Sequence, residues 1–128
     1  MSSRFARCAL PIALLIFAHC GSSTEPSSAL TGLWREGSPS GSRIDLSLSS
    51  SFGAIIGTGR QYVVGSLFDS LTVSGHWNAD HTFHLAMTFA NTTPATYDGA
   101  FVGSNQLDGT MTRNGDTAPH VAFFRQTQ

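Results

Sequence analysis

The chain has 128 residues, a formal net charge of −1 and only 12% charged residues, about half the share found in a typical soluble domain. It is too short for a multidomain enzyme, and it has no lysine and no basic stripe that could neutralise nucleic-acid phosphates. Hydrophobic residues still make up 41% of the chain and there are 13 glycines. This composition excludes a disordered protein and favours short strands and turns over helices.

The first residues have the layout of a secretory signal peptide. Arg4 and Arg7 supply positive charge, and an apolar run at 9–18 follows them. That run is too short to cross a bilayer, which takes about twenty apolar residues. Residues 1–19 are therefore predicted to be a leader, and the protein is predicted to be exported.

The segment 17–23 resembles the lipobox of bacterial lipoproteins, in which the cysteine is acylated and becomes the first mature residue. The resemblance implies that Cys20 is lipidated and anchors the protein to a membrane of the bacterial cell envelope, on its periplasmic or surface side. Simple secretion is the alternative, because His19 stands where lipoproteins have a small residue. Residues 20–29 are predicted to form a flexible tether. Removal of Cys8 with the leader would leave Cys20 without a disulfide partner.

From residue 30 onward, apolar and polar residues alternate, and turn residues recur about every ten positions. The pattern predicts eight strands, at 30–36, 43–50, 53–64, 70–78, 82–90, 95–102, 106–114 and 120–126. Short connections between consecutive strands indicate an antiparallel up-and-down meander. An open sheet would expose two edges, so we expect one all-β domain over residues 30–128 that closes into a small barrel.

The alternation also predicts which side chains point into this barrel. A three-residue loop at 79–81 would pair Trp77 with Phe83 inside and His76 with His84 outside. In the second strand the predicted outward residues are Arg43, Asp45 and Ser47. Glycines recur at inward mid-strand positions, where they either let the strands coil tightly or leave space for a ligand.

A tryptophan on the first strand and an arginine on the last resemble a known signature. The sequence Gly32-Leu33-Trp34, together with Arg125, is similar to the calycin signature of lipocalins, fatty-acid-binding proteins and avidins. In that group the arginine stacks over the tryptophan and closes one end of the barrel by cation–π attraction. The resemblance implies the same closure role for Trp34 and Arg125. The whole mature chain is similar to small exported bacterial lipocalin-like domains, which implies an architecture but no substrate.

Patterns that would indicate catalysis or a cofactor are not found in the sequence. The acidic residues are scattered, and there is no G-x-S-x-G nucleophile elbow. His76 and His84 come nearest to a metal site, but zinc sites normally recruit a third or fourth ligand, so no metal is predicted. We expect a protein that is not an enzyme, with no cofactor and no nucleic-acid partner.

The predicted function is binding of a small, mostly apolar ligand in the mouth or interior of the barrel. The side chains expected to line this site are Trp77, Phe83, Leu85, Met87, Tyr97, Phe101 and Met111, with Tyr97 as a polar anchor. The alternative is that these side chains fill the core and that the protein is an envelope interaction module, such as a small protease inhibitor or an accessory lipoprotein. Leu67 and Phe68, apolar in the predicted loop 65–69, would then contact an envelope protein partner.

Overall fold

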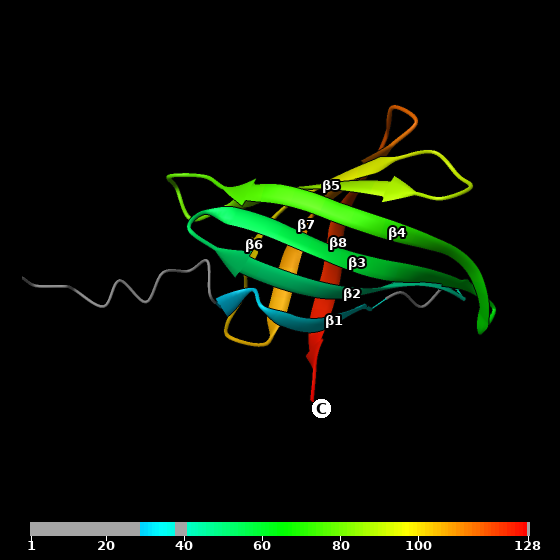
Figure 1. Ribbon diagram of the computed structural model, residues 1–128, viewed down its shortest axis with the longest axis horizontal. Coiled ribbons are helices and arrows are strands. Elements are labelled where there is room, and N and C mark those ends of the chain that lie inside the picture. The colour runs from blue at the N-terminus through cyan, green and yellow to red at the C-terminus, as the bar shows by residue number, and fades with distance from the viewer. Residues whose placement is uncertain (1–28, 38–40, 128) are drawn as a thin grey trace, which may run out of the picture.

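The computed structural model, which describes residues 29–37 and 41–127, is a closed antiparallel barrel. Its strands are β1 (Gly32–Glu36), β2 (Ser42–Ser51), β3 (Ala54–Val63), β4 (Ser66–Trp77), β5 (Phe83–Phe89), β6 (Ala95–Phe101), β7 (Gln106–Arg113) and β8 (Asp116–Gln126). Each strand pairs with the next along the chain, and β8 returns to pair with β1 (Figure 1). The predicted all-β, up-and-down barrel is confirmed. The predicted leader and Cys20 lie outside the described residues, as does the tether up to residue 28.

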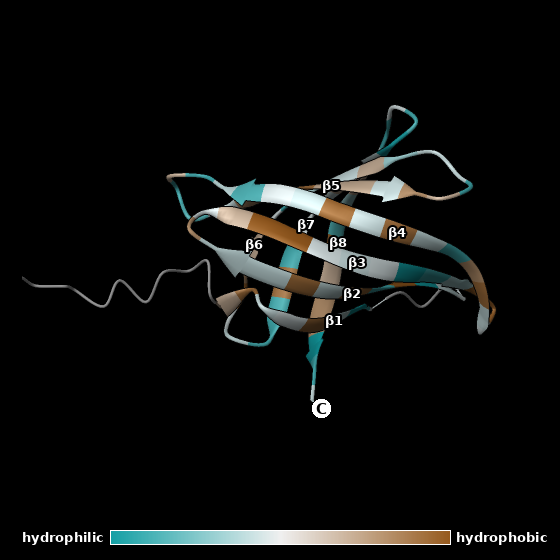
Figure 2. Ribbon diagram, in the orientation of Figure 1, coloured by the Kyte–Doolittle hydropathy of each residue, from teal (hydrophilic) through white to brown (hydrophobic). Residues whose placement is uncertain are grey.

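The predicted faces of the strands are confirmed by the register. Trp77 lies opposite Phe83 and His76 opposite His84, across a loop in which the Asn78 N–H donates to the Thr82 carbonyl oxygen at 2.8 Å. Apolar and polar residues alternate along the strands, so banded ribbons cross the front of the barrel in Figure 2. Because one side of every strand faces inward, the buried apolar residues of all eight strands form one core. Within the described residues, no helix has the length and hydropathy needed to cross a membrane.

The inward glycines let neighbouring strands approach closely. A Cβ atom at Gly59 would lie 2.7 Å from the Asp45 carbonyl oxygen and 2.8 Å from a Leu46 methyl carbon, well inside van der Waals contact. At Gly57, Gly75 and Gly109 the nearest atom to such a Cβ is likewise a backbone carbonyl oxygen of the neighbouring strand. These glycines therefore serve the tight coiling of a small barrel and do not leave open space.

Two strands begin four residues earlier than the sequence pattern predicts. The predicted loop at 65–69 is replaced by a two-residue turn, Val64-Gly65, in which both residues have positive φ (51° and 78°), as type I′ hairpin turns require. In β8, the turn-forming Pro119 lies where the ladder with β7 shifts register. A bulge accommodates proline because no ladder hydrogen bond is required there, so this proline does not end the strand.

Trp34 fills the end of the barrel where the chain enters β1. Its side chain is 1% exposed, and its indole N–H donates to the Leu30 carbonyl oxygen at 2.8 Å. Arg125 lies opposite Trp34 in the β1–β8 ladder, with its guanidinium carbon 4.3 Å from the centre of the tryptophan ring. The same guanidinium donates to the Thr31 carbonyl oxygen at 3.0 Å and to that of Ala29. Stacking and hydrogen bonding thus join the first and last strands.

Truncation of this tryptophan should therefore destabilise the whole barrel. We expect Trp34→Ala to lower the free energy of unfolding by about 3 to 5 kcal/mol, the usual cost of deleting a buried aromatic side chain. Urea unfolding measures the change. Ile56→Ala, at an outward position that is 64% exposed, is the control and should change the value by less than about 0.5 kcal/mol. Equal effects of the two substitutions would contradict the closure role.

Candidate functional site

The side chains that the sequence predicts around an interior ligand lie in the core and contact one another. Phe83, Leu85, Met87 and Tyr97 are fully buried, and Trp77, Phe101 and Met111 pack against them while half-buried. Trp77 and Phe101 are stacked with ring centroids 6.0 Å apart, and Phe83 meets Trp77 edge-on at 5.3 Å. Packed aromatic contacts of this kind are typical of a protein core and occupy the space that a ligand would need.

Tyr97, the predicted polar anchor, is hydrogen-bonded within the protein. Its hydroxyl donates to the Val121 carbonyl oxygen at 2.8 Å. Burial, followed by the nearby charges of Asp108 and Glu36, raises the pKa of this phenol, so it stays protonated. The groove on the outer face, described below, includes none of the seven predicted lining residues. The expected site in the barrel interior therefore finds no support in the packing.

The barrel end opposite Trp34 is covered by the loop between β5 and β6. The Asp69 carboxylate, 3% exposed, accepts hydrogen bonds from the Thr92 hydroxyl at 2.8 Å, from the Asn91 side-chain amide at 3.1 Å and from the Ser70 N–H at 2.9 Å. Burial acts to raise the pKa of Asp69, but these hydrogen bonds together outweigh it and hold the pKa below its ordinary value. The ionised carboxylate thus fixes the loop to β4.

Arg113 completes this covered end. Its guanidinium carbon lies 4.2 Å from the centre of the Phe89 ring, and it donates to the Thr92 hydroxyl at 2.6 Å and to the Thr93 carbonyl oxygen at 3.0 Å. Each end of the barrel therefore carries an arginine stacked on an aromatic ring, Arg125 at one and Arg113 at the other. Hydrogen-bonded segments therefore lie at both ends of the barrel, where the sequence predicts a mouth for the ligand.

A groove of about 950 Å³ lies on the outer face of the barrel. It is lined by three consecutive residues from each of five neighbouring strands or their ends, at 33–35, 45–47, 58–60, 70–72 and 88–90, together with Tyr62, Gln126 and Thr127. Outward side chains such as Ser47 and Thr58 are exposed, whereas the inward Leu46 and Leu71 between such positions are buried. The groove therefore lies outside the core, as the hyperboloid surface of a twisted barrel permits.

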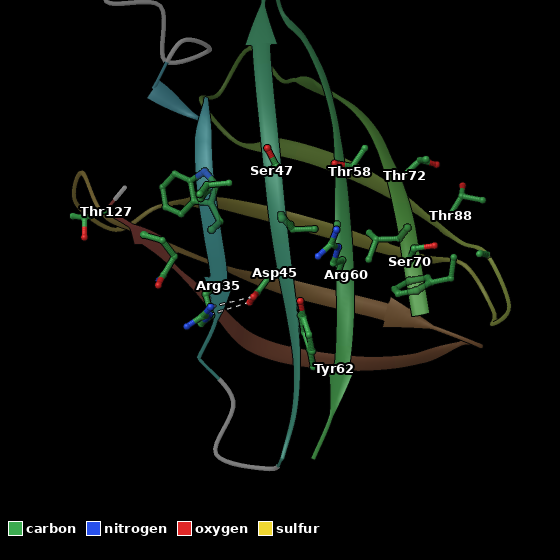
Figure 3. Close-up of a pocket in the computed structure, with 18 residues that line it drawn as sticks. Arg35, Asp45, Ser47, Thr58, Arg60, Tyr62, Ser70, Thr72, Thr88 and Thr127 are labelled. Carbon is green, nitrogen blue, oxygen red and sulfur yellow. Dashed lines mark hydrogen bonds and ion pairs between the residues drawn. The ribbon is translucent and has the colours of Figure 1, made fainter. Parts of the chain in front are cut away.

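Four hydroxyl side chains form a row along this groove. Ser47 lies opposite Thr58, Thr58 opposite Thr72, and Thr72 opposite Thr88 in successive ladders. Figure 3 shows these four residues following one another across the strands. Residues opposite each other in register lie on the same face of the sheet, so the row crosses the strands from β2 to β5.

Beside the hydroxyl row lies a cluster of charged side chains. Arg35 donates two hydrogen bonds to the Asp45 carboxylate, at 3.1 and 3.2 Å, and Arg43 approaches the same carboxylate at 3.3 Å (Figure 3 shows the first pair). Arg60 is also opposite Asp45 in the β2–β3 ladder. It is exposed, and among the described residues it has neither a hydrogen bond nor an ion pair. Arg43 also stacks on Tyr62, at 4.6 Å from the ring centre.

Exposed apolar side chains gather at the far end of the β3–β4 hairpin. They are Val63, Val64, Leu67 and Phe68, which we call the hairpin tip. Leu67 and Phe68 lie in β4 and not in a loop, a correction that follows from the early start of this strand. A β-bulge pairs Gln61 with Asp69 and Tyr62 with Leu67, so Phe68 has no partner across the ladder. Figure 2 shows the brown colour at this end of β4.

His76 and His84 lie side by side on the outer face, with ring centroids 5.6 Å apart. The Nδ1 atom of His84 lies 2.6 Å from a carboxylate oxygen of Asp98. In the stretches 29–37 and 41–127, no group of three or more His, Cys, Asp and Glu side chains could hold a metal ion.

The sequence interpretation missed the groove and the Asp69 loop anchor. The alternation in β2 predicts the outward orientation of Arg43, Asp45 and Ser47. It does not predict the register that places Arg60 opposite Asp45. The sequence around Asp69 does not indicate that it anchors a loop, because its four hydrogen-bond donors come from Ser70 and from a loop more than twenty residues away. Comparison of the chain with protein-family models, curated proteins and solved structures finds no match.

The loop anchor gives the barrel a predictable dependence on pH. Because the pKa of Asp69 is lower in the folded state, its stabilising contribution is present above the unfolded value of about 3.9 and is lost as the pH falls through the folded value. Asp69→Asn should therefore lower the melting temperature at pH 7, and the difference from the unsubstituted protein should shrink toward pH 2. Thr92→Val, which removes one donor to Asp69 and also the acceptor of the Arg113 hydrogen bond, should lower the melting temperature at pH 7 as well. A difference that is the same at both pH values would contradict the role of the charge.

Proposed function

We propose that this protein is a lipid-anchored interaction module of the bacterial cell envelope, without enzymatic activity, that binds an envelope protein through the hairpin tip. The observation that carries the proposal is the group of four exposed apolar side chains at that tip. The interior favours this function over carriage of a small apolar ligand, because the side chains expected to line a ligand site contact one another.

The conformation of the tip supports a role in binding. Val64 has φ 51°, which is a strained backbone conformation for a β-branched residue. Its side chain is 83% exposed, so burial within the protein does not offset this strain. Phe68 is displaced outward by the bulge next to Asp69. Full burial of an exposed apolar side chain is worth about 1.5 to 3 kcal/mol, and these four are 38 to 83% exposed, so contact with a partner would recover part of that free energy at each. Aromatic and aliphatic anchors of this kind are typical of the centre of a protein interface.

The position of the tip favours a protein partner over the anchoring membrane. In Figure 1 the β3–β4 hairpin lies at the opposite end of the barrel from the start of β1. A strand of twelve residues, such as β4, spans about 40 Å. The tether that the sequence predicts over residues 20–29 would, as a flexible chain, have a root-mean-square length of about 17 Å. A lipid on Cys20 would then hold the end at Gly32 near the membrane and direct the tip away from it.

Photo-crosslinking in the native envelope tests this proposal. The full-length protein carries a photoreactive phenylalanine analogue in place of Val64 or, as the matched control, in place of Phe52. Phe52 is 96% exposed and lies in the β2–β3 turn at the other end of the barrel. We expect a discrete protein adduct from position 64 and none of the same mass from position 52. Phe68→Asp should reduce the adduct by about tenfold or more, since it removes an apolar anchor.

Two outcomes would contradict the proposal. The first is that positions 64 and 52 give the same adducts, or that Phe68→Asp leaves the adduct from position 64 unchanged. The second is a small apolar molecule retained by the purified protein in native mass spectrometry and displaced by Phe101→Trp, which would restore the carrier function predicted for the interior.

Membrane anchoring makes a separate prediction. Cys20→Ser removes the thiol that would be acylated, so the protein should move from the membrane fraction to the soluble fraction after ultracentrifugation of lysed cells. Cys8→Ser, within the predicted leader, is the control and should leave the partitioning unchanged. If Cys20→Ser protein stays in the membrane fraction, the anchor is not a lipid on this cysteine.

A further inference from the structure

We infer that the outer groove over β1–β5 binds an acidic polysaccharide, through its carboxylate or phosphate groups and its sugar hydroxyls. This inference goes beyond the proposed function, because it concerns another surface and another class of ligand. It depends on two independent features of the groove: a guanidinium without a counter-ion, and a row of hydroxyl groups without hydrogen-bond partners among the described residues.

The positive charge of the groove favours an anionic ligand. Arg35 and Arg60 line the groove together with one carboxylate, Asp45, so the lining has a net charge of +1 in a chain whose net charge is −1, and Arg43 approaches the same carboxylate from outside the lining. Two of the arginines already contact Asp45, and Arg60 is exposed and has no counter-ion within residues 29–37 and 41–127. A guanidinium presents a planar fork of N–H donors that matches the oxygens of a carboxylate or phosphate. Arg60 is therefore the group that would hold the anionic substituent.

The hydroxyl row can bind a ligand that both donates and accepts hydrogen bonds. Ser47, Thr58, Thr72 and Thr88 lie on successive strands, which are about 4.8 Å apart in a sheet. Each hydroxyl is one donor and two acceptors, and none of the four is hydrogen-bonded to another described residue. Sugar hydroxyls have the same dual character. The row crosses the strands, so it suits an extended chain lying along the groove.

The closed barrel disfavours a peptide as the occupant. Extended peptides typically bind by adding a strand to a free sheet edge, where the backbone supplies the hydrogen bonds. Every described strand is already paired on both sides, so the groove offers side chains and no free backbone edge. Apolar side chains such as the exposed Leu33 also line the groove, and the hydroxyl and guanidinium groups are its hydrogen-bonding partners for a ligand. That chemistry fits a hydroxylated, negatively charged polymer.

Isothermal titration of the purified full-length protein tests the assignment. The probes are polygalacturonate, which carries carboxylates, a polyglycerol phosphate bearing sugar substituents, and neutral dextran. We expect binding to one or both of the charged polymers, weakened by salt, and none to dextran. Binding to only one of them would identify the anionic group. Arg60→Glu should weaken binding by about tenfold or more, and Arg60→Lys should weaken it less because the charge is kept.

Matched variants separate this site from the hairpin tip and from general charge effects. Thr58→Val and Thr72→Val should each weaken binding, whereas Thr96→Val, on the outer face of β6 and outside the groove, should not. Val64→Ser, an uncharged change in the turn of the hairpin tip, should leave polysaccharide binding unchanged, which keeps this test independent of the proposed function. Equal binding of dextran, or no effect of Arg60→Glu, would overturn the inference. So would equal binding of poly-glutamate that Thr58→Val and Thr72→Val do not affect, since an acidic peptide would then be the ligand.

Discussion

The fold depends on the contact that closes the barrel, Trp34 beneath Arg125. Trp34 supplies apolar bulk at the entrance of β1, and Arg125 supplies both a cation over its ring and hydrogen bonds to the segment that precedes the strand. These contacts join residues more than ninety positions apart in the sequence. A sheet of eight strands left open here would expose two edges and one side of its core. Closure therefore pairs both edges of the sheet and gives the barrel a single core.

Closure of so small a barrel also determines where binding can occur. Glycines such as Gly59 bring the strands close together, and the inward aromatic side chains meet in the space that remains. Arg113 and the Asp69 anchor hold a loop over the end opposite Trp34. The interior is therefore used for stability. The proposed recognition sites lie on the outer surface, which has two distinct features, an apolar hairpin tip and a groove that contains an arginine with no ion pair among the described residues.

A low overall charge makes the few charged groups more significant. Among the described residues there are five arginines: two stack over aromatic rings at the barrel ends, and the other three gather around Asp45. Arg125 and Arg113 act as structural cations. Arg60 has no such partner in the part of the chain that the structure describes, which is why the groove is a candidate for an anionic ligand.

The sequence by itself determined the strand number, the antiparallel order, and the inward and outward faces, because each depends on local alternation and short turns. It also indicated the Trp34–Arg125 pair. It placed the starts of β4 and β8 too late, since a Val64-Gly65 turn and a bulge at Pro119 resemble loops until a neighbouring strand pairs with them.

Only the tertiary structure decided that the predicted ligand-lining residues pack together, that Asp69 anchors a distant loop, and that Arg60 lies opposite Asp45. These features depend on cross-strand register and on the curvature of the closed sheet, which no local pattern in the sequence encodes.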